Sequence, residues 1–344
     1  MRVAPWAAAL LLWAAAPGPS GAEVARARYR MGPLCQATAA GDDSARATAA
    51  IEAALDTIAG IERGMTSWRH DSELSLLNDA TGTARGCSAD LFAVLDSALA
   101  MAAATGGAFD PTVEPLSRAW DLRGPGRVPT PAEIGAARDR VGWRGLQLDP
   151  AARTARLDRT GMGLDLGGIA KGFALDRARE ILRERGVEGA LLNLGGEILV
   201  IGNAPAAEGP GAGRASGAAW RVEIAHPTDR LHPAITFAAR DRAISTSAQS
   251  ERGFTARGRR YGHVLDPRTG LPVESRAAVT VVARSGTRAD ALSTALLVMG
   301  REEAARWCHE HPADGVVWLE PRGAAVRAWA WNAPPLEADR KSVV

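Results

Sequence analysis

Hydrophobic residues recur every three or four positions in several parts of the chain, which is the spacing of one face of an α-helix. The pattern predicts five helical segments: 42–65, 88–107, 130–142, 169–185 and 288–308. Residues that commonly begin or end helices lie at the predicted ends of these segments. An Asp/Ser pair lies at the start of the first segment, Gly106 and Gly107 end the second, and Pro131 lies in the first turn of the third.

Shorter apolar or alternating segments predict β-strands around these helices. They are 24–31, 146–158, 190–202, 220–227, 234–240, 242–247, 259–266, 277–284, 314–320 and 326–331, the second and third each divided by a turn. The stretch 203–219 is rich in Gly, Ala and Pro without periodicity, which predicts an exposed loop. Because strands and helices alternate without a strict βαβ rhythm, we expect an α+β fold: a single large domain of mixed sheets and helices over 23–335, with a tail at 336–344.

The chain begins with a short apolar run behind one early arginine. Residues 5–16 are apolar, and the small residues at 20–22 match a cleavage site. We interpret 1–22 as a secretory signal peptide, which predicts an exported, soluble mature protein. The alternative is a membrane anchor, but the run is too short to cross a bilayer comfortably.

Composition narrows the classes of function. The 344 residues, 46% of them hydrophobic, are enough to bury a sizeable core. The formal net charge is +2 and the basic residues are scattered, so we expect no nucleic-acid partner. An oxidising compartment could pair two of the three cysteines, Cys35, Cys87 and Cys308, but neither that pairing nor the oligomeric state follows from the sequence.

A carboxylate and a hydroxyl stand four residues apart in the stretch RADALSTALLVMG. Asp290 and Thr294 fall on one helical face near the first turn of the predicted helix, so together they offer two hard oxygens. Taken alone, the pair favours a plainer interpretation, in which Asp290 caps the helix and Thr294 packs against it.

Glycines directly precede another predicted helix in DLGGIAKG. Gly167 and Gly168 would let a phosphate or a carbonyl approach closely, although the spacing is that of neither a dinucleotide-binding nor a P-loop motif. They could equally allow tight packing of strand and helix. Lys171 at the helix start opposes the helix dipole, which predicts an anionic group nearby.

Three further sites have a chemical and a structural interpretation. His263, in a predicted strand before the turn DPRTG, is a candidate general base or a structural residue. Asp110 and Glu114 could do acid–base work, but the prolines around them favour Asp110 as a helix cap. Trp68 either packs partly into the core or presents a ring that stacks on another ring. The histidines show no HExxH pairing, which argues against a zinc site of that kind.

Taken in order, these segments resemble the ApbE-type FAD:protein FMN transferases, also called flavin transferases. The segments are MGPLC, SWRHDSELSLLN, GGAFDPTVEPL, LDLGGIAKGFALDRA, LLNLGGEI, ISTS, YGHVLDPRTGLP and ADALSTALLVMG. The resemblance implies an ApbE-like, T-fold-related architecture. It also implies a periplasmic, Mg²⁺-dependent enzyme that cleaves FAD and esterifies FMN onto a Thr or Ser hydroxyl of another protein, releasing AMP. That acceptor would be a flavoprotein subunit of a membrane or periplasmic redox complex.

The resemblance also implies roles for individual residues. The magnesium ligands would be the carbonyl of Ala170 and the side chains of Asp290 and Thr294. The flavin nucleotide would contact Ser293, Met31, Trp68, Ala108, Phe109, Asp110, Gly167, Phe173 and Leu265. Lys171 and His263 would lie near the pyrophosphate, with His263 the first candidate for the general base and Asp290 a substitute.

One segment departs from the family pattern. After ISTS the family usually continues with Gly and an aromatic-rich YE segment, whereas residues 248–251 here are Ala, Gln, Ser and Glu. If that turn needs a positive φ, Ala248 would strain it. The same residues would also serve a Mg²⁺-dependent FAD pyrophosphatase that makes FMN and AMP. The altered segment leaves open a non-catalytic periplasmic flavin-binding assembly factor.

Overall fold

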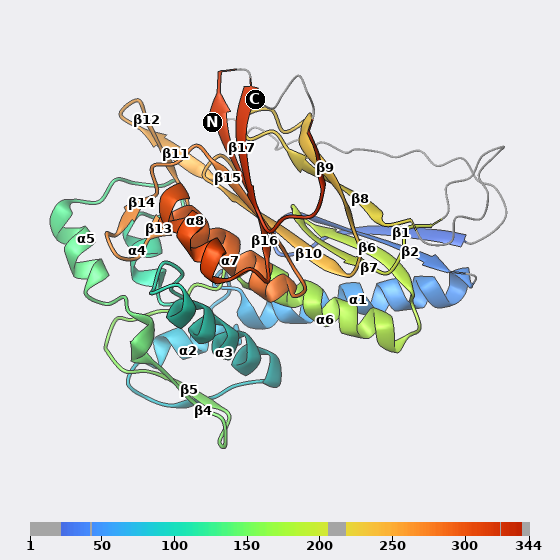
Figure 1. Ribbon diagram of the computed structural model, residues 1–344. Helices are drawn as coiled ribbons and strands as arrows, with labels where there is room; N and C mark the ends of the chain where they lie inside the picture. The colour runs from blue at the N-terminus through green and yellow to red at the C-terminus, as the bar shows by residue number, and fades with distance from the viewer. Residues whose placement is uncertain (1–21, 42, 206–217, 324, 339–344) are drawn as a thin grey trace.

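The computed structural model describes residues 22–41, 43–205, 218–323 and 325–338. Its centre is a sheet of eight strands in which every neighbouring pair is antiparallel (Figure 1). In spatial order these are β1 (Ala22–Tyr29), β2 (Leu34–Gly41), β6 (Gly189–Leu194), β7 (Glu197–Ile201), β10 (Arg242–Ala248), β15 (Ala278–Ala283), β16 (Gly315–Arg322) and β17 (Ala325–Trp331).

Three helices cover one face of this sheet: α1 (Ser44–Met65), α6 (Ala170–Glu184) and α7 (Gly286–Met299) (Figure 1). Helix α1 follows its apolar spacing, burying Ile51, Leu55 and Ile58, and Asp43 caps it. Helix α6 packs between α1 and α7. The main core lies between these helices and the sheet, so residues at the ends of α6 and α7 are held on a rigid layer.

A smaller sheet covers the opposite face. It contains β8 (Trp220–Ala225), β9 (Pro233–Ala239) and β18 (Leu336–Ala338). Trp220, Ile235 and Phe237 of this sheet pack against Val317 and Leu319 of β16 in a second core. The molecule therefore has three layers, with the large sheet in the middle, and the prediction of an α+β fold of mixed sheets and helices is confirmed.

Short elements extend the domain beyond the layers. They are α2 (Glu73–Asp79), β3 (Arg85–Gly86), α3 (Ala89–Ala104), α4 (Glu114–Ala119), α5 (Pro131–Arg138), the 3₁₀ turn Trp143–Gly145, β4 (Leu146–Asp149), β5 (Thr154–Leu157), β11 (Gly253–Ala256), β12 (Arg259–Gly262), β13 (Leu265–Asp266), β14 (Leu271–Pro272) and α8 (Arg301–Glu310). A third apolar cluster joins α4 and α5 to β13.

The structure differs from the sequence predictions in a few places. Strand β2 was missed, and Gly300 divides the predicted helix 288–308 into α7 and α8. Ala248 ends β10 in regular pairing with Ala278 and has no positive φ, so the strain considered for that turn does not arise. Within the predicted tail, Leu336–Ala338 pairs with β9. Residues 1–21 of the predicted signal peptide and 206–217 of the predicted loop lie outside the described residues.

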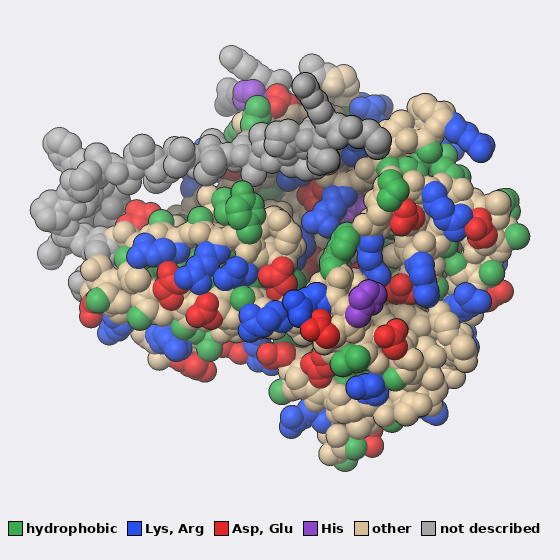
Figure 2. Space-filling view, turned by 180° about the vertical axis from the view of Figure 1, so that it is seen from behind, with side chains coloured by type: hydrophobic (Ala, Val, Ile, Leu, Met, Phe, Trp, Pro, Cys, Tyr) green, Lys and Arg blue, Asp and Glu red, His purple; other side chains and the backbone are tan. Residues whose placement is uncertain are grey.

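Two further observations concern the helices of the described residues and the charges on one face of the molecule. Among the described residues, no helix combines the length and the apolar character that crossing a bilayer would require. On the face shown in Figure 2, Lys and Arg side chains are interspersed with Asp and Glu, so that face carries no extended field of one sign.

Candidate active site

Asp290 lies in the second turn of α7 rather than at its start. The helix begins at Gly286, and the hydroxyl of Ser285 caps it by accepting a hydrogen bond from Arg288 N. The interpretation of Asp290 as a helix cap is therefore wrong. Its side chain is 3% exposed and faces α6, where its Oδ2 accepts a hydrogen bond from Gly172 N at 2.9 Å.

The start of α6 meets α7 at very close range. A Cβ on Gly172 would overlap the carbonyl of Gly286, so only glycine permits this approach. A Cβ on Gly168 would lie 3.1 Å from Thr294 Oγ1. Ala170, the first residue of α6, lies between these two contacts. The structure therefore brings the three predicted metal ligands, Ala170, Asp290 and Thr294, to one junction.

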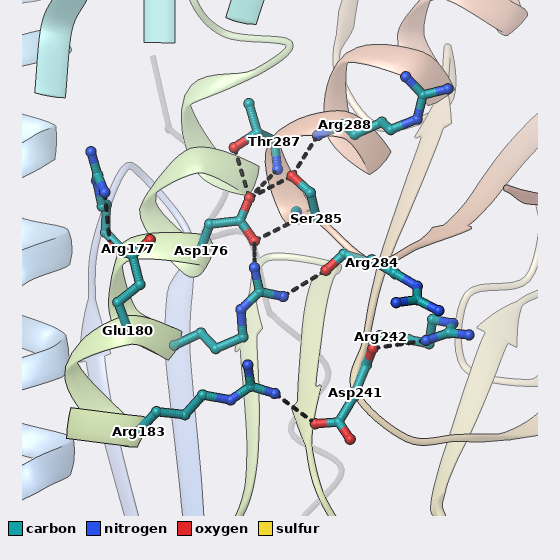
Figure 3. A network of polar contacts seen from close by, with 12 residues as sticks. Asp176, Arg177, Glu180, Arg183, Asp241, Arg242, Arg284, Ser285, Thr287 and Arg288 are labelled. Carbon is teal, nitrogen blue, oxygen red and sulfur yellow. Dashed lines mark hydrogen bonds and ion pairs between the residues drawn. The ribbon is translucent and has the colours of Figure 1, made fainter. Parts of the chain in front are cut away.

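A buried carboxylate on α6 fastens the two helices together (Figure 3). Asp176 accepts hydrogen bonds from Ser285 Oγ at 2.7 Å, Gly286 N at 2.8 Å, Thr287 N at 2.9 Å and Thr287 Oγ1 at 2.8 Å. It also pairs with Arg179 at 2.7 Å. Asp176 thus satisfies the free N–H groups at the start of α7 from a neighbouring helix. It fixes the register between Ala170 and Asp290.

Charged groups crowd around the junction. Lys171 forms an ion pair with the buried Glu197 of β7, which is the anionic neighbour that its position predicted. Burial alone would lower the pKa of Lys171, but Glu197, Asp290 and Glu251 outweigh that effect and raise it. Burial raises the pKa of Asp290, and Glu197 adds to the rise. Burial also raises the pKa of Glu251, so the charged forms of both Asp290 and Glu251 are disfavoured here.

The donors at this junction fit Mg²⁺. A carboxylate, a hydroxyl and a carbonyl are the hard oxygen ligands that this ion prefers, and it commonly keeps waters or phosphate oxygens as its remaining ligands. A divalent cation at this place would stabilise the charged form of Asp290, which burial disfavours. Within the described part of the chain, no three His, Cys, Asp or Glu side chains are placed to hold a metal, and Asp290 is the one carboxylate among the three predicted ligands.

Hydroxyl groups from β10 line the same side of α7. Ser293 Oγ lies 2.8 Å from Ser247 Oγ and 3.2 Å from Ser245 Oγ. Ser247 Oγ also lies 3.2 Å from Thr294 Oγ1. The ISTS segment therefore meets the ADALST segment, which places the predicted nucleotide contact Ser293 beside the predicted ligand Thr294.

His263 lies in a bend between β12 and β13, so its predicted place in a strand is wrong. Its Nδ1 is 3.3 Å from the carbonyl oxygen of Arg252. Since a carbonyl only accepts, Nδ1 carries the proton and Nε2 is left as an acceptor. Burial, with help from the cations of Arg252 and Lys171, lowers the pKa of His263 to about 4. The imidazole is therefore neutral at pH 7.

Two loops of the predicted flavin pocket are joined. Asp165 N donates to the carbonyl of Pro111 at 2.8 Å, so the loop with Ala108, Phe109 and Asp110 lies beside the loop with Gly167. Asp110 is buried, which raises its pKa, and accepts hydrogen bonds from Thr112 and from Trp143 N. It does not cap a helix, since the residue before α4 is Val113, so that interpretation is wrong.

The other predicted pocket residues are more scattered. Phe173 is buried beneath the guanidinium of Arg177, and Met31 packs at the edge of the main core. Trp68, between α1 and α2, is 69% exposed, which leaves its ring free to stack. Leu265 packs instead in the third apolar cluster. The residues predicted to hold the metal and the phosphates therefore lie close together at the junction of α6 and α7. The residues predicted to contact the flavin ring are more dispersed.

A cavity of about 450 Å³ opens between α3, α6 and α7, on another side of the helices. Phe173 is the one predicted site residue among those that line it, together with Met101, Ile169, Arg177 and Arg288. Asp290 and Thr294 do not line it. The three predicted metal ligands therefore lie outside the lining of this cavity.

Sequence reasoning missed four residues that build the site: Asp176, Glu197, Ser247 and Gln249. Glu197 had a weak signal, since it follows the glycine pair that turns β6 into β7. Asp176 had a weaker one, as an acid on the apolar face of a predicted helix. Ser247 and Gln249 had no local signal. Ser247 contacts Ser293, 46 residues away in sequence, and Gln249 contacts Val264, 15 residues away.

Comparisons with known proteins agree with this geometry. Residues 31–317 match the family model described as ApbE family. An FAD:protein FMN transferase of Treponema pallidum is 33% identical over 312 residues, covering 87% of this chain and 85% of the relative. One from Salmonella typhimurium is 31% identical over 283 residues, covering 80% and 78%.

Solved structures show the same likeness. The crystal structure of the ApbE protein from Thermotoga maritima aligns with a TM-score of 0.78 at 26% identity, covering 93% of this chain and 98% of the other. The flavin transferase ApbE from Vibrio cholerae aligns with a TM-score of 0.77 at 28% identity, covering 91% and 98%. On these matches and on the arrangement of its site, the chain belongs to the ApbE family.

Proposed function

We propose that this chain is an FAD:protein FMN transferase that moves FMN from FAD onto a Thr or Ser hydroxyl of another protein and releases AMP. The observation that carries the proposal is the meeting of Ala170, Asp290 and Thr294 where α6 and α7 touch. The names of the relatives support the same reaction.

The residues at the junction have complementary roles in the proposed reaction. Asp290, Thr294 and the Ala170 carbonyl would hold Mg²⁺. The bound ion would neutralise charge on the pyrophosphate and orient the AMP leaving group. Lys171 adds a positive charge beside the same phosphates. Ser293 and Ser247 offer hydroxyls to phosphate oxygens.

His263 is the proposed general base. Its neutral Nε2 would accept the proton of the acceptor hydroxyl as that oxygen bonds to the phosphorus of FMN and the phosphoanhydride bond to AMP breaks. Such a base contributes on the order of 10² to 10⁴ in rate. The acceptor would be a flavoprotein subunit of a membrane or periplasmic redox complex. Export by the predicted signal peptide would place the enzyme with it.

The test is direct. Purified protein is mixed with FAD, Mg²⁺ and a candidate acceptor, and flavin fluorescence that survives denaturation is measured on the acceptor. We expect labelling that requires Mg²⁺ and is lost in Asp290→Ala. Release of FMN and AMP without any acceptor labelling would instead identify an FAD pyrophosphatase. Bound FAD without any turnover would identify a flavin-binding assembly factor.

A further inference from the structure

Gln249 lies in the segment that departs from the family pattern, and the proposed reaction gives it no role. It follows the last residue of β10 and is 7% exposed. A buried amide needs partners for its two N–H groups and its oxygen, because an unpaired one costs about 1–3 kcal/mol. Its partners therefore show what the side chain holds in place.

All three partners are backbone groups of Val264, which follows His263, or of Val273, which follows β14. Nε2 donates to the carbonyl of Val264 at 2.7 Å and to that of Val273 at 2.9 Å. Oε1 accepts from Val264 N at 2.9 Å. Both backbone groups of the residue after His263 are therefore bound by one side chain. A Cβ on Gly262 would overlap Gln249 Oε1, so the residue before His263 is in contact with it as well.

The same end of β10 is tied to the metal junction. Ser247, two residues before Gln249, contacts Ser293 and Thr294 of α7. A continuous set of contacts therefore runs from Thr294 through Ser247 and Gln249 to Val264. By contrast, among the described residues the His263 ring has one hydrogen bond, 3.3 Å long, to the carbonyl of Arg252. The carbonyl of Val264 also accepts a hydrogen bond from Val273 N at 2.9 Å, and the amide of Gln249 adds three hydrogen bonds to this backbone contact at the bend.

We propose that Gln249 is a positioning residue, which holds the bend at His263 against the end of β10 so that the imidazole faces the junction of α6 and α7. The proposal rests on the proposed function for the role of His263. A shift of about 1 Å in a reacting group can cost on the order of 10² in rate, so the anchor has a measurable kinetic effect.

The test is a double-mutant cycle on FMN transfer at saturating FAD and acceptor. Gln249→Met keeps the length and burial of the side chain but removes its three hydrogen bonds. We expect it to lower kcat on the order of 10²-fold in the wild-type background and by less than about twofold in His263→Ala, because residues that act as one unit are not additive. Gln147→Met, on the exposed side of β4, is the matched control and leaves kcat unchanged.

Equal losses in both backgrounds, or no loss in either, would overturn the proposal, since a general structural defect does not depend on His263. If Gln249→Met does not fold, Gln249→Glu replaces it in the same cycle. This variant keeps an acceptor for Val264 N but sets a carboxylate oxygen against two carbonyls, and we expect the same dependence on His263.

A readout independent of activity separates this proposal from the proposed function. The ¹³Cε1 resonance of His263, assigned by its loss in His263→Ala, is recorded in the wild type and in Gln249→Met. We expect it to shift or broaden, while the other histidine signals stay in place. An unchanged resonance overturns the positioning role. If the wild type transfers no FMN, the proposed function fails, but this spectrum still decides the role of Gln249.

Discussion

At the scale of single residues, Asp290 is a buried carboxylate whose pKa is raised to about 7, first by burial and then by the charge of Glu197. Asp290→Asn keeps an oxygen for Gly172 N and removes a negative charge that Glu197 and Glu251 repel. We expect the metal-free variant to be no less stable than the wild type. Its rise in Tm on adding Mg²⁺ disappears, and FMN transfer falls about 10³-fold, because a bound metal supplies several kcal/mol.

Thermal unfolding with and without Mg²⁺, followed by the transfer assay, measures both effects. Asp56→Asn, on the exposed face of α1, is the control and keeps the full rise in Tm. A variant at position 290 that still gained stability from Mg²⁺ would show that the ion binds elsewhere.

His263 predicts a pH dependence of stability. Its pKa of about 4 lies below the ordinary value of about 6.5, so the unfolded chain takes up this proton first as the pH falls. The group has no effect above about pH 6.5 and destabilises the folded state progressively down to about pH 4. His263→Gln removes this effect, so its unfolding free energy falls less than that of the wild type between about pH 7 and pH 4.5.

Urea unfolding at the two pH values tests this prediction, with the exposed His309→Gln as control. Parallel losses in the wild type and in His263→Gln would mean that His263 titrates near its ordinary value.

Individual site residues were predictable only in part. Asp290, Thr294 and Ala170 came from the family resemblance, since the i, i+4 spacing alone favoured a cap. The sequence does not show which residue of another element contacts a given side chain. Asp176 looks like an ordinary helical acid until Gly286 and Thr287 are seen donating to it from another helix.

At the scale of elements, the contact between α6 and α7 decides whether the site exists. Gly172→Ala would push its Cβ into the carbonyl of Gly286 and separate the helices. We expect a loss of about 1–3 kcal/mol in unfolding free energy and a weaker response to Mg²⁺, because overpacking shifts backbone in a dense core. Urea unfolding and Mg²⁺ titration of Tm give both values.

Gly135→Ala in α5 is the matched control. A Cβ there meets nothing within 4 Å, so the variant gains up to about 1 kcal/mol from helix propensity. A tolerated Gly172→Ala would mean that α6 and α7 can slide apart without harm to the site.

Elements with strong periodicity were predicted well. Helix α1 has an apolar stripe and a cap, and α6 begins one residue from its predicted start. Strand β2 was missed because Leu34–Gly41 has small residues whose burial comes from the neighbouring strands and α1 rather than from a local pattern. The sequence around His263 predicts a strand, because contacts that hold the bend, such as those of the Gln249 amide, come from residues remote in sequence.

At the scale of the whole molecule, the class of fold followed from the order of elements, but the layering did not. Nothing local indicates that β1 and β2 join β6, or that β18 returns to β9 across the chain. These pairings depend on long-range burial, so the two cores on either side of the large sheet were not predictable from periodicity.

The reactivity of the three cysteine thiols measures which parts of this layered structure unfold together. Cys35 of β2 and Cys308 of α8 are buried in the main core, and burial raises the pKa of both to about 11. Cys87 is half-buried outside a regular element, so it should react first, although its pKa is also raised.

With Ellman's reagent we expect one thiol of the native protein to react faster than the other two, and this fast reaction to be absent in Cys87→Ser. The other two should react together, at a rate set by global unfolding, because they share one core. If Cys308 reacted well before Cys35, α8 would open separately from the sheet, and the main core would not be a single cooperative unit.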